Sequence, residues 1–413
     1  MKTAAFLMVV VGIVVLRLKS NRNNVCKTFE DYYSNRDENP NCYYNPDHEL
    51  EVPEIVMRYG YPIEEHNVTT SDGYILTVFR IPHGIHTKTT SKKPVFLQHG
   101  LAINSGSFLI TGRKSLGFML ADAGYDVWLG NFRGSKYSNN HVYLDNQSEA
   151  FWNFSIQENG LYDLPAQINF VSNVTKQKIA YLGYSMGTTA AYIYLSTYPD
   201  EKKIDMLIGL APAIYFHDVD FIEFFSKIWV VVAAPIQFIT NGKMYPRMGT
   251  MFKYLCLPYP IQMELCQLFD MLIMGFSYAE NDPETLPVSL LYNSDSASVN
   301  TFWHFEQLRK SQKFQSYDYG ETENLLIYNS ATPPPYNMSN INIENHLFYA
   351  DNDKLATATN VKLLYNDLQK TSNVHKLYRI EDEYFNHANF LSGKNAGSLL
   401  YRRILKLLDS TYK

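Results

Sequence analysis

The 413-residue sequence predicts an α/β fold in which a mostly parallel central sheet is flanked by helices and interrupted by a helical cap insertion. Two observations lead to this prediction. Short apolar segments of strand length alternate with helix-length segments in the first half of the chain and again near its end, which is typical of βαβ units and a parallel sheet. After Ala213 this alternation stops, and helix-length apolar runs continue to about Tyr319.

The predicted strands are short and apolar, and turn residues separate them from their neighbours. Ser71-Asp72-Gly73 is turn chemistry directly before the first long strand. Helix-length segments such as 115–123 and 188–197 lie between the later strands, and an amphipathic helix is expected over about 396–408. In chain order, the expected strands are 74–81, 94–98, 125–129, 178–182, 206–210, 346–349 and 375–380.

The segment after Ala213 is interpreted as a cap over the sheet. Its most apolar run, 224–239, is interrupted by Lys227 and Pro235, which favours a buried or lipid-facing helix over a membrane span. Pro333-Pro334-Pro335 is expected to form a stiff return to the sheet. The predicted organisation is a signal peptide (1–20), an N-terminal segment (21–52), the first part of the core (53–213), the helical cap (214–335) and the second part of the core (336–413).

The first twenty residues predict a secretory signal peptide. Lys2 supplies the positive start, 4–16 is apolar, and Ser20 lies where cleavage is expected. A single-pass anchor is the alternative, but this apolar run is shorter than the roughly 20 residues that span a bilayer. We therefore expect no transmembrane segment after signal cleavage, and a secreted or lysosomal destination.

Cysteines and glycosylation motifs agree with the secretory route. Four cysteines can pair fully in an oxidising compartment, and proximity along the chain favours Cys26 with Cys42 and Cys256 with Cys266. Asn-x-Ser/Thr motifs are the acceptors of N-linked glycans. They begin at Asn67, Asn146, Asn153, Asn173 and Asn337.

The charge balance argues against a partner that is a polyanion. The chain has 36 basic and 41 acidic side chains and a net charge of −5, without a cluster of Lys and Arg. Nucleic-acid binding requires such clusters, because phosphates must be neutralised. No metal-ligand spacing and no cofactor motif is visible, and no motif implies a protein partner.

The sharpest local signal is Gly183-Tyr184-Ser185-Met186-Gly187, where strand 178–182 gives way to a helix. Glycines two residues before and after a serine, in this strand-to-helix context, are typical of a nucleophile elbow, because so tight a turn leaves no room for side chains there. This context predicts the α/β-hydrolase fold with Ser185 as the nucleophile. An ordinary strand-to-helix loop is the alternative.

A serine hydroxyl needs a base that is oriented by an acid. In this fold the partners follow in the order serine, acid, histidine, each in a loop after a strand. Asp353 follows strand 346–349 and is the predicted acid, with Asp351 as the alternative. His387 follows strand 375–380 and is the predicted base, with His375 as a weaker alternative.

Two backbone amides are the predicted oxyanion donors. The fold takes one from the residue after the nucleophile, here Met186, and another from a loop after an early strand. His99-Gly100-Leu101 is placed for the second role, with Leu101 as the donor. A simple turn is the alternative interpretation of His99-Gly100.

From about Pro53 to its C-terminus, the chain resembles the acid lipase family, which includes gastric lipase, lysosomal acid lipase and insect relatives. Many ordered segments carry the resemblance, so it is highly specific. They are 72–76, 97–101, 120–131, 133–134, 137–138 with 141, 151–152, 162–166, 307–320, 334–341, 352–353 with 355–356, and 386–387.

The resemblance implies hydrolysis of triacylglycerols or sterol esters at a lipid interface, with Ser185, Asp353 and His387 as the triad and Leu101 and Met186 as oxyanion donors. It also implies a cap disulfide between Cys256 and Cys266. Three departures change the polarity beside these groups. The family usually has His before the nucleophile, Gln after it, and His-Leu-Asp-Phe at the base, where this chain has Tyr184, Met186 and His387-Ala388-Asn389-Phe390.

These observations together predict a serine-dependent lipid esterase that works through an acyl-enzyme on Ser185. Two alternatives remain open at the level of sequence. One is a weakly active or inactive lipid-binding relative, which the altered neighbours of Ser185 and His387 suggest. The other is an esterase that acts on small soluble esters.

Overall fold

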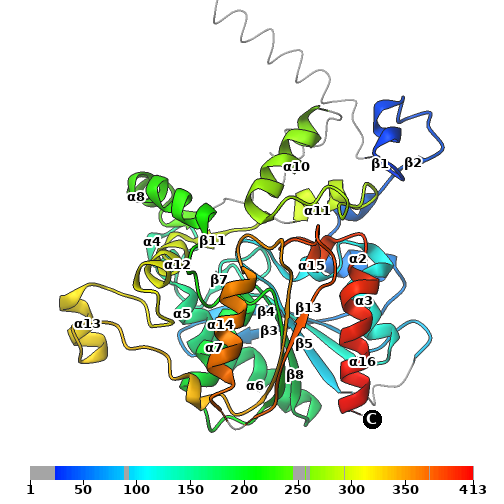
Figure 1. The fold of residues 1–413 in the computed structure, drawn as a ribbon. Helices are drawn as coiled ribbons and strands as arrows, with labels where there is room; N and C mark the ends of the chain where they lie inside the picture. The colour runs from blue at the N-terminus through cyan, green and yellow to red at the C-terminus, as the bar shows by residue number, and fades with distance from the viewer. Residues whose placement is uncertain are drawn as a thin grey trace, which may run out of the picture.

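The computed structural model describes residues 24–87, 93–244, 256, 261–292, 294–371 and 373–412. The predicted signal peptide, 1–20, lies outside these residues. Figure 1 shows a central sheet with helices on both faces and a layer of further helices above one end of the strands. This arrangement confirms the predicted α/β class.

The central sheet of the described residues has nine strands in the order β13-β12-β9-β8-β5-β6-β4-β3, with β7 paired to β4. Neighbours from β13 to β6 are parallel, whereas β4 is antiparallel to β3, β6 and β7. The strands are β3 (Glu64–Thr69), β4 (Tyr74–Ile81), β5 (Pro94–Gln98), β6 (Asp126–Gly130), β7 (Asn140–His141), β8 (Ile179–Tyr184), β9 (Ile204–Leu210), β12 (Glu344–Tyr349) and β13 (His375–Arg379).

The central strands are apolar because both of their faces are covered. Every residue of β5, β6 and β8 is buried, as expected for parallel strands between two layers of helices. Edge strand β3 is different, because exposed and partly buried residues alternate along most of it. It continues the sheet through hydrogen bonds to β4 and has no continuous apolar run.

Helices cover both faces of the sheet. One layer contains α6 (Leu164–Thr175), α7 (Met186–Thr197) and α14 (Ala358–Leu368), and the other contains α3 (Leu116–Asp122) and α16 (Arg402–Thr411). Ile404 and Leu408, four residues apart, are the fully buried positions of α16. A π-helical turn, Gly397–Tyr401, runs directly into α16, so the last helix is continuous but begins with π-helical geometry. It ends at Thr411, three residues after the expected end at 408.

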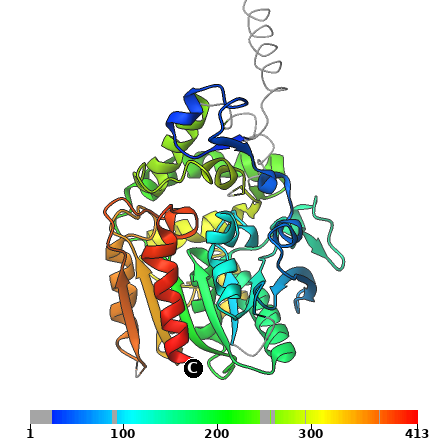
Figure 2. The same ribbon diagram turned by 90° about the vertical axis from the view of Figure 1, so that its right-hand side faces the viewer.

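Most of the chain between β9 and β12 forms helices above the carboxyl ends of the parallel strands (Figures 1 and 2). They are α8 (Asp220–Thr240), α10 (Ile261–Met274), α11 (Leu286–Tyr292) and α12 (Val299–Ser311). The next helix, α13 (Glu321–Tyr328), lies to one side, level with α7 and α14 (Figure 1). Trp229 and Ala233 of α8 are buried against Val299 of α12, and α8 continues through Pro235. Within the described ranges, no helix combines the length and apolarity that a bilayer crossing requires.

A small N-terminal hairpin lies on this cap. Its strands, β1 (Asn24–Cys26) and β2 (Cys42–Tyr44), pair antiparallel and are joined by the Cys26–Cys42 disulfide. The Tyr32 hydroxyl donates a hydrogen bond to the carbonyl oxygen of Pro283 at 2.8 Å, and Tyr32 packs with Met263 of α10. Figure 2 shows the hairpin seated on the cap helices.

The second disulfide, Cys256–Cys266, lies inside the cap, so both pairs that sequence proximity favours are present. Among the sequon asparagines, Asn67, Asn153, Asn173 and Asn337 are exposed. Asn146 is half-buried, and its side-chain nitrogen, the atom that would carry a glycan, donates to the Asn139 carbonyl oxygen at 3.0 Å.

Candidate active site

Ser185 lies on a strained turn between β8 and α7. Its backbone has φ 52° and ψ −119°, a conformation that residues with a Cβ rarely adopt. The Ser185 amide donates to the Leu210 carbonyl oxygen at 2.9 Å, which ties the turn to the neighbouring strand β9. This is the backbone geometry of a nucleophile elbow.

Close packing explains the two glycines of the elbow. A Cβ on Gly187 would lie 2.4 Å from the carbonyl oxygen of Gln98, and one on Gly183 would lie 2.8 Å from the amide nitrogen of Thr188. Both contacts are with backbone atoms, which cannot rotate away. Strand β5 and helix α7 can therefore approach Ser185 only because these two positions lack side chains.

Three loops that are far apart in the chain meet at Ser185. The Nε2 atom of His387 lies 3.0 Å from the Ser185 Oγ, and the His387 Nδ1 lies 2.8 Å from the Asp353 Oδ2. His387 and Asp353 are 2 % and 1 % exposed, so both hydrogen bonds are shielded from water. With Nδ1–H donating to Asp353, Nε2 is left to accept the serine proton.

The second carboxylate oxygen of Asp353 is held by its own loop. Oδ1 accepts hydrogen bonds from the amides of Leu355 and Ala356 at 2.9 and 2.8 Å. The two alternatives from the sequence lie elsewhere. Asp351 is exposed and pairs with Arg379, and His375 bonds to Asn345 and Thr371 at the start of β13.

The loop that carries Leu101 lies beside Ser185, and Met186 directly follows Ser185 in the chain. A Cβ on Gly100 would lie only 3.1 Å from the Ser185 Cβ, so this loop runs alongside the predicted nucleophile. Neither the Leu101 amide nor the Met186 amide has a hydrogen-bond partner in the part of the chain that the structure describes. A cavity of about 20 Å³, room for roughly one water-sized group, is lined by both residues.

His99 fixes the direction of the Leu101 amide, a role that sequence reasoning missed. The His99 Nδ1 donates to the carbonyl oxygen of Gly100 at 2.8 Å, and its Nε2 accepts from the Phe132 amide at 3.1 Å. Because the Gly100 carbonyl and the Leu101 amide belong to one planar peptide unit, fixing the first fixes the second. Burial lowers the pKa of His99 to about 4, so the neutral ring keeps both bonds at neutral pH.

Two of the family departures contact the histidine loop. The Tyr184 hydroxyl donates to the His387 carbonyl oxygen at 3.0 Å, and burial raises the pKa of this phenol well above its usual value. Asn389 Oδ1 accepts from the Asn386 amide at 2.8 Å and from the Ser277 hydroxyl at 2.5 Å. The contacts of Tyr184 with His387 and of Ser277 with Asn389 have no local signal in the sequence, because each joins segments from different parts of the chain.

The end of α10 is bound to the same loops. The Met274 carbonyl oxygen accepts from the amides of His387 and Lys354 at 3.3 and 3.2 Å. The Gly275 carbonyl oxygen accepts from Asn386 Nδ2 at 2.7 Å. The cap is thus hydrogen-bonded to the loop of the predicted base and the loop of the predicted acid.

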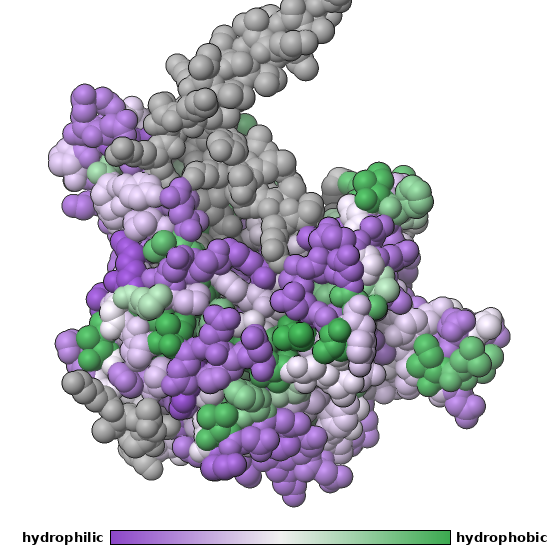
Figure 3. Space-filling model, turned by 180° about the vertical axis from the view of Figure 1, so that it is seen from behind, coloured by the Kyte–Doolittle hydropathy of each residue, from purple (hydrophilic) through white to green (hydrophobic). Residues whose placement is uncertain are grey.

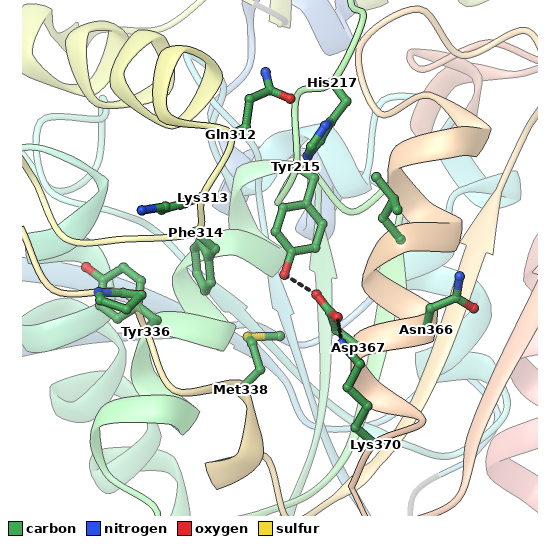
Figure 4. A pocket seen from close by; sticks show the side chains of 12 residues that line it. Tyr215, His217, Gln312, Lys313, Phe314, Tyr336, Met338, Asn366, Asp367 and Lys370 are labelled. Atoms are coloured by element: carbon green, nitrogen blue, oxygen red, sulfur yellow. Dashed lines mark hydrogen bonds and ion pairs between the residues drawn. The ribbon is translucent and has the colours of Figure 1, made fainter.

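A larger cavity of about 490 Å³ opens beside α14, and none of the predicted catalytic residues lines it. In Figure 4 the Tyr215 hydroxyl points to Asp367, which also pairs with Lys370, while Phe314 and Met338 cover another wall. This cavity is separate from the serine site.

The sheet order, the strained serine and its histidine partner define a class of protein, the α/β hydrolases. Comparison with known families agrees. The profile described as "alpha/beta hydrolase fold" matches residues 93–230, and the one described as "Partial alpha/beta-hydrolase lipase region" matches residues 52–112. A soluble variant of the monoglyceride lipase of Saccharomyces cerevisiae has the same fold, with a TM-score of 0.52 at 12 % identity over 86 % of this chain and 96 % of that one.

Curated relatives narrow the class. The chain is 36 % identical to gastric triacylglycerol lipase of Bos taurus, over 89 % of its own length and 94 % of the relative's. It is 35 % identical to Lipase 1 of Drosophila melanogaster, over 88 % and 80 % of the two lengths. Identity to the lysosomal acid lipase/cholesteryl ester hydrolase of Macaca fascicularis is 34 %, over 88 % and 92 %. The chain belongs to the acid lipase family, as the resemblance predicts.

Proposed function

We propose that this protein hydrolyses carboxylic esters of neutral lipids, triacylglycerols or sterol esters, through an acyl-enzyme on Ser185. The observation that carries the proposal is the continuous run of hydrogen bonds from Asp353 through His387 to Ser185. Membership of a family whose named members are lipases supports the substrate class.

The chemistry follows from this run of bonds. His387 takes the Ser185 proton as Oγ attacks the ester carbonyl, and Asp353 holds the ring tautomer and stabilises the imidazolium. The amides of Leu101 and Met186 bind the developing oxyanion, each such donor contributing about 2.7–4 kcal/mol. His387 then protonates the departing alcohol, and water releases the fatty acid in a second cycle.

Exposed apolar side chains on the cap support the proposal that the substrate is a water-insoluble lipid. Figure 3 shows apolar clusters over α8 and over α13 on one side of the molecule. Contiguous exposed apolar groups of this kind mark interaction surfaces. The exposed residues are Val231, Phe238 and Ile239 on α8, Leu265, Phe269 and Leu272 on α10, and Leu325, Leu326 and Ile327 on α13.

The two disulfides support folding in an oxidising compartment, and we infer a secreted or lysosomal destination. Two of the relatives named above are called a gastric and a lysosomal lipase, which agrees with this route. We infer that the protein binds a lipid interface. Among the described residues, we expect the exposed apolar side chains of the cap to contact that interface.

Covalent labelling tests the nucleophile. A fluorophosphonate probe should label the wild-type protein and leave Ser185→Ala unlabelled, because the probe needs an activated serine. The wild-type protein without the probe should hydrolyse emulsified trioleoylglycerol faster than a short soluble ester. A wild-type protein that resists the probe contradicts the acyl-enzyme, and activity on the soluble ester alone contradicts the lipid substrate class.

A further inference from the structure

Asp295 is a buried residue of the cap that contacts the loop of the predicted oxyanion donor Leu101. It lies between α11 and the short cap strand β11 (Ala297–Ser298), and 1 % of its surface is exposed. Its amide donates a hydrogen bond to the Ala102 carbonyl oxygen at 2.7 Å. Its Oδ2 atom accepts a hydrogen bond from Asn104 Nδ2 at 2.8 Å. A single cap residue is therefore bonded to the stretch of loop that directly follows Leu101.

The carboxyl group of Asp295 joins a second core loop to the first. Oδ2 also accepts a hydrogen bond from the Lys136 amide at 2.8 Å, and Oδ1 accepts one from the Ser296 amide at 2.7 Å. A buried carboxyl group is costly unless donors reach it. Because these donors come from the cap, from the loop after β5 and from the loop after β6, the carboxyl group favours the one arrangement in which all of them meet.

The backbone of Ala102 has a conformation that needs such support. Its φ is 55°, in the left-handed region that a residue with a Cβ adopts only at a cost. Conformations of this kind persist where surrounding contacts hold them. The Asp295 amide holds the Ala102 carbonyl oxygen, and His99 holds the Gly100 carbonyl oxygen. Leu101 therefore lies between two anchored carbonyl groups.

The segment that begins at Asp295 is also a wall of the predicted oxyanion site. Ser296 and Ala297 line the cavity of about 20 Å³ together with both predicted oxyanion donors. At the other end of this segment, the Ser298 hydroxyl donates to the Trp152 carbonyl oxygen at 2.6 Å. Residues 295–298 are thus bonded to the core at both ends and border the cavity between them.

An oxyanion donor acts in the transition state, because the negative charge on the ester oxygen develops there. A donor that points in a wrong direction leaves substrate binding nearly unchanged and slows the chemical step. Contacts that fix the direction of the Leu101 amide should therefore affect kcat far more than KM.

We propose that Asp295 is a positioning residue that holds the Leu101 amide in the direction that the oxyanion requires, so that the oxyanion site depends on a residue of the cap. This inference rests on the proposed function, because it assigns a role in acyl transfer at Ser185. Asp295 acts through the loop that it holds, by way of Ala102 and Asn104.

The test compares wild-type protein, Asp295→Ala and Asp295→Asn on a monomeric ester. Complete loss of one oxyanion donor lowers kcat about 10²–10³-fold, so a displaced donor should cost about tenfold. We expect this loss of kcat in Asp295→Ala, with KM within about twofold of wild type. Asp295→Asn keeps one oxygen that can accept from Asn104 and Lys136, so it should restore most of the rate.

Inhibition by a long-chain trifluoromethyl ketone gives a second measurement. Its adduct with Ser185 carries a negatively charged oxygen where the ester oxyanion would lie, so its affinity reports on the oxyanion donors. The inhibition constant should rise in Asp295→Ala by about the same factor as kcat falls. A purely structural role for Asp295 would not produce this match.

Asn104→Ser tests the same contact from the core side. Serine can still accept from the Gly106 amide, as Asn104 does, but it is too short to reach Asp295. It should lower kcat with little change in KM. Combined with Asp295→Ala, it should lower kcat by less than the product of the two separate effects. This variant decides the question if Asp295→Ala does not fold.

Glu280→Ala is the matched control. Glu280 is likewise a buried carboxyl group of the cap that accepts from a backbone amide and a side-chain amide of the core, at 3.0 and 2.6 Å, but both belong to Asn395. The substitution should lower the melting temperature and leave kcat and ketone inhibition within about twofold of wild type.

Two results would overturn the inference. One is an equal loss of kcat in Glu280→Ala, which would show that any broken contact between cap and core has this effect. The other is unchanged kcat and ketone inhibition in folded Asp295→Ala, or in Asn104→Ser. Failure of the wild-type protein to react with the fluorophosphonate overturns the proposed function instead, so the two failures are distinguishable.

Discussion

The hydroxyl group of Tyr184 donates a hydrogen bond to the backbone carbonyl oxygen of His387 at 3.0 Å. The residue directly before Ser185 thus holds the loop that carries His387. The ring of Tyr184 also lies against the imidazole, with 5.1 Å between ring centroids. A position where this chain departs from its family therefore has a defined contact in the site.

We expect Tyr184→Phe to lower kcat about fivefold with little change in KM. One neutral hydrogen bond contributes about 1 kcal/mol, and its loss leaves the His387 loop less well held. Steady-state kinetics on a monomeric ester measure both constants. Tyr192→Phe is the control, because it removes a buried hydroxyl bonded to Asn345, far from the serine. Equal loss of kcat in both variants would contradict the positioning role.

Two neighbouring aspartates should behave differently. Asp353→Asn should lower kcat by about four orders of magnitude, because the amide cannot hold the imidazole tautomer that accepts the serine proton. Asp351→Asn should keep activity within about twofold, because its exposed pair with Arg379 contributes little. Single-turnover acylation rates would separate the two. Comparable loss in Asp351→Asn would contradict the assignment of Asp353, rather than Asp351, as the acid.

Buried histidines should make the fold acid-sensitive. His304 is 1 % exposed, its Nε2 donates to the Gln315 carbonyl oxygen, and burial lowers its pKa to about 4. The unfolded chain binds this proton near pH 6.5. The contribution of neutral His304 to the free energy of unfolding is therefore fully present above about pH 6.5. It is lost as the pH falls from 6.5 towards 4, at about 1.4 kcal/mol for each pH unit.

Thermal melting of wild type and His304→Gln between pH 7 and pH 4 tests this sign. The glutamine can still donate to Gln315 but does not titrate, so its melting temperature should fall less over this interval. Parallel curves for the two proteins would show that His304 does not contribute. His99 has the same direction of shift but is unsuitable for the test, because it positions the Leu101 amide.

The N-terminal hairpin should stabilise the cap. Replacing Cys26 and Cys42 by Ala opens a loop closed over a sequence separation of 16, which should lower the hairpin's free energy of unfolding by about 3 kcal/mol. Tyr32→Phe should have a smaller effect, since it keeps the disulfide and removes the hydroxyl group that bonds to Cys26 and Pro283. Hydrogen exchange of α10 and α11 amides should be faster in both. Unchanged exchange would show that the hairpin does not hold the cap.

The strands, and the loops that bring Ser185, Asp353 and His387 together, could be expected from the sequence because their signals are local. Each central strand is a short apolar run between turns, and observed bounds such as Pro94–Gln98 match the expected ones. Each predicted catalytic residue follows such a strand. Strand β3 has no such run, because it lies at the edge of the sheet with polar side chains in water.

What could not be predicted depends on contacts between distant parts of the chain. Tyr32 meets Pro283 across 251 residues, and the bond of His99 to Phe132 spans 33. Such pairings arise from the tertiary fold, which the pattern of one segment does not contain.

The double hydrogen bond to the Met274 carbonyl oxygen restricts how substrate can gain entry. If the cap swung away at this end of α10, it would pull on the loops of His387 and Lys354 and disturb the proton path. An opening that leaves these loops in place would therefore keep this end of α10 fixed and move the opposite end, beside Met263. Because Met263 and Tyr32 belong to one buried cluster, the hairpin would move together with that end of the helix.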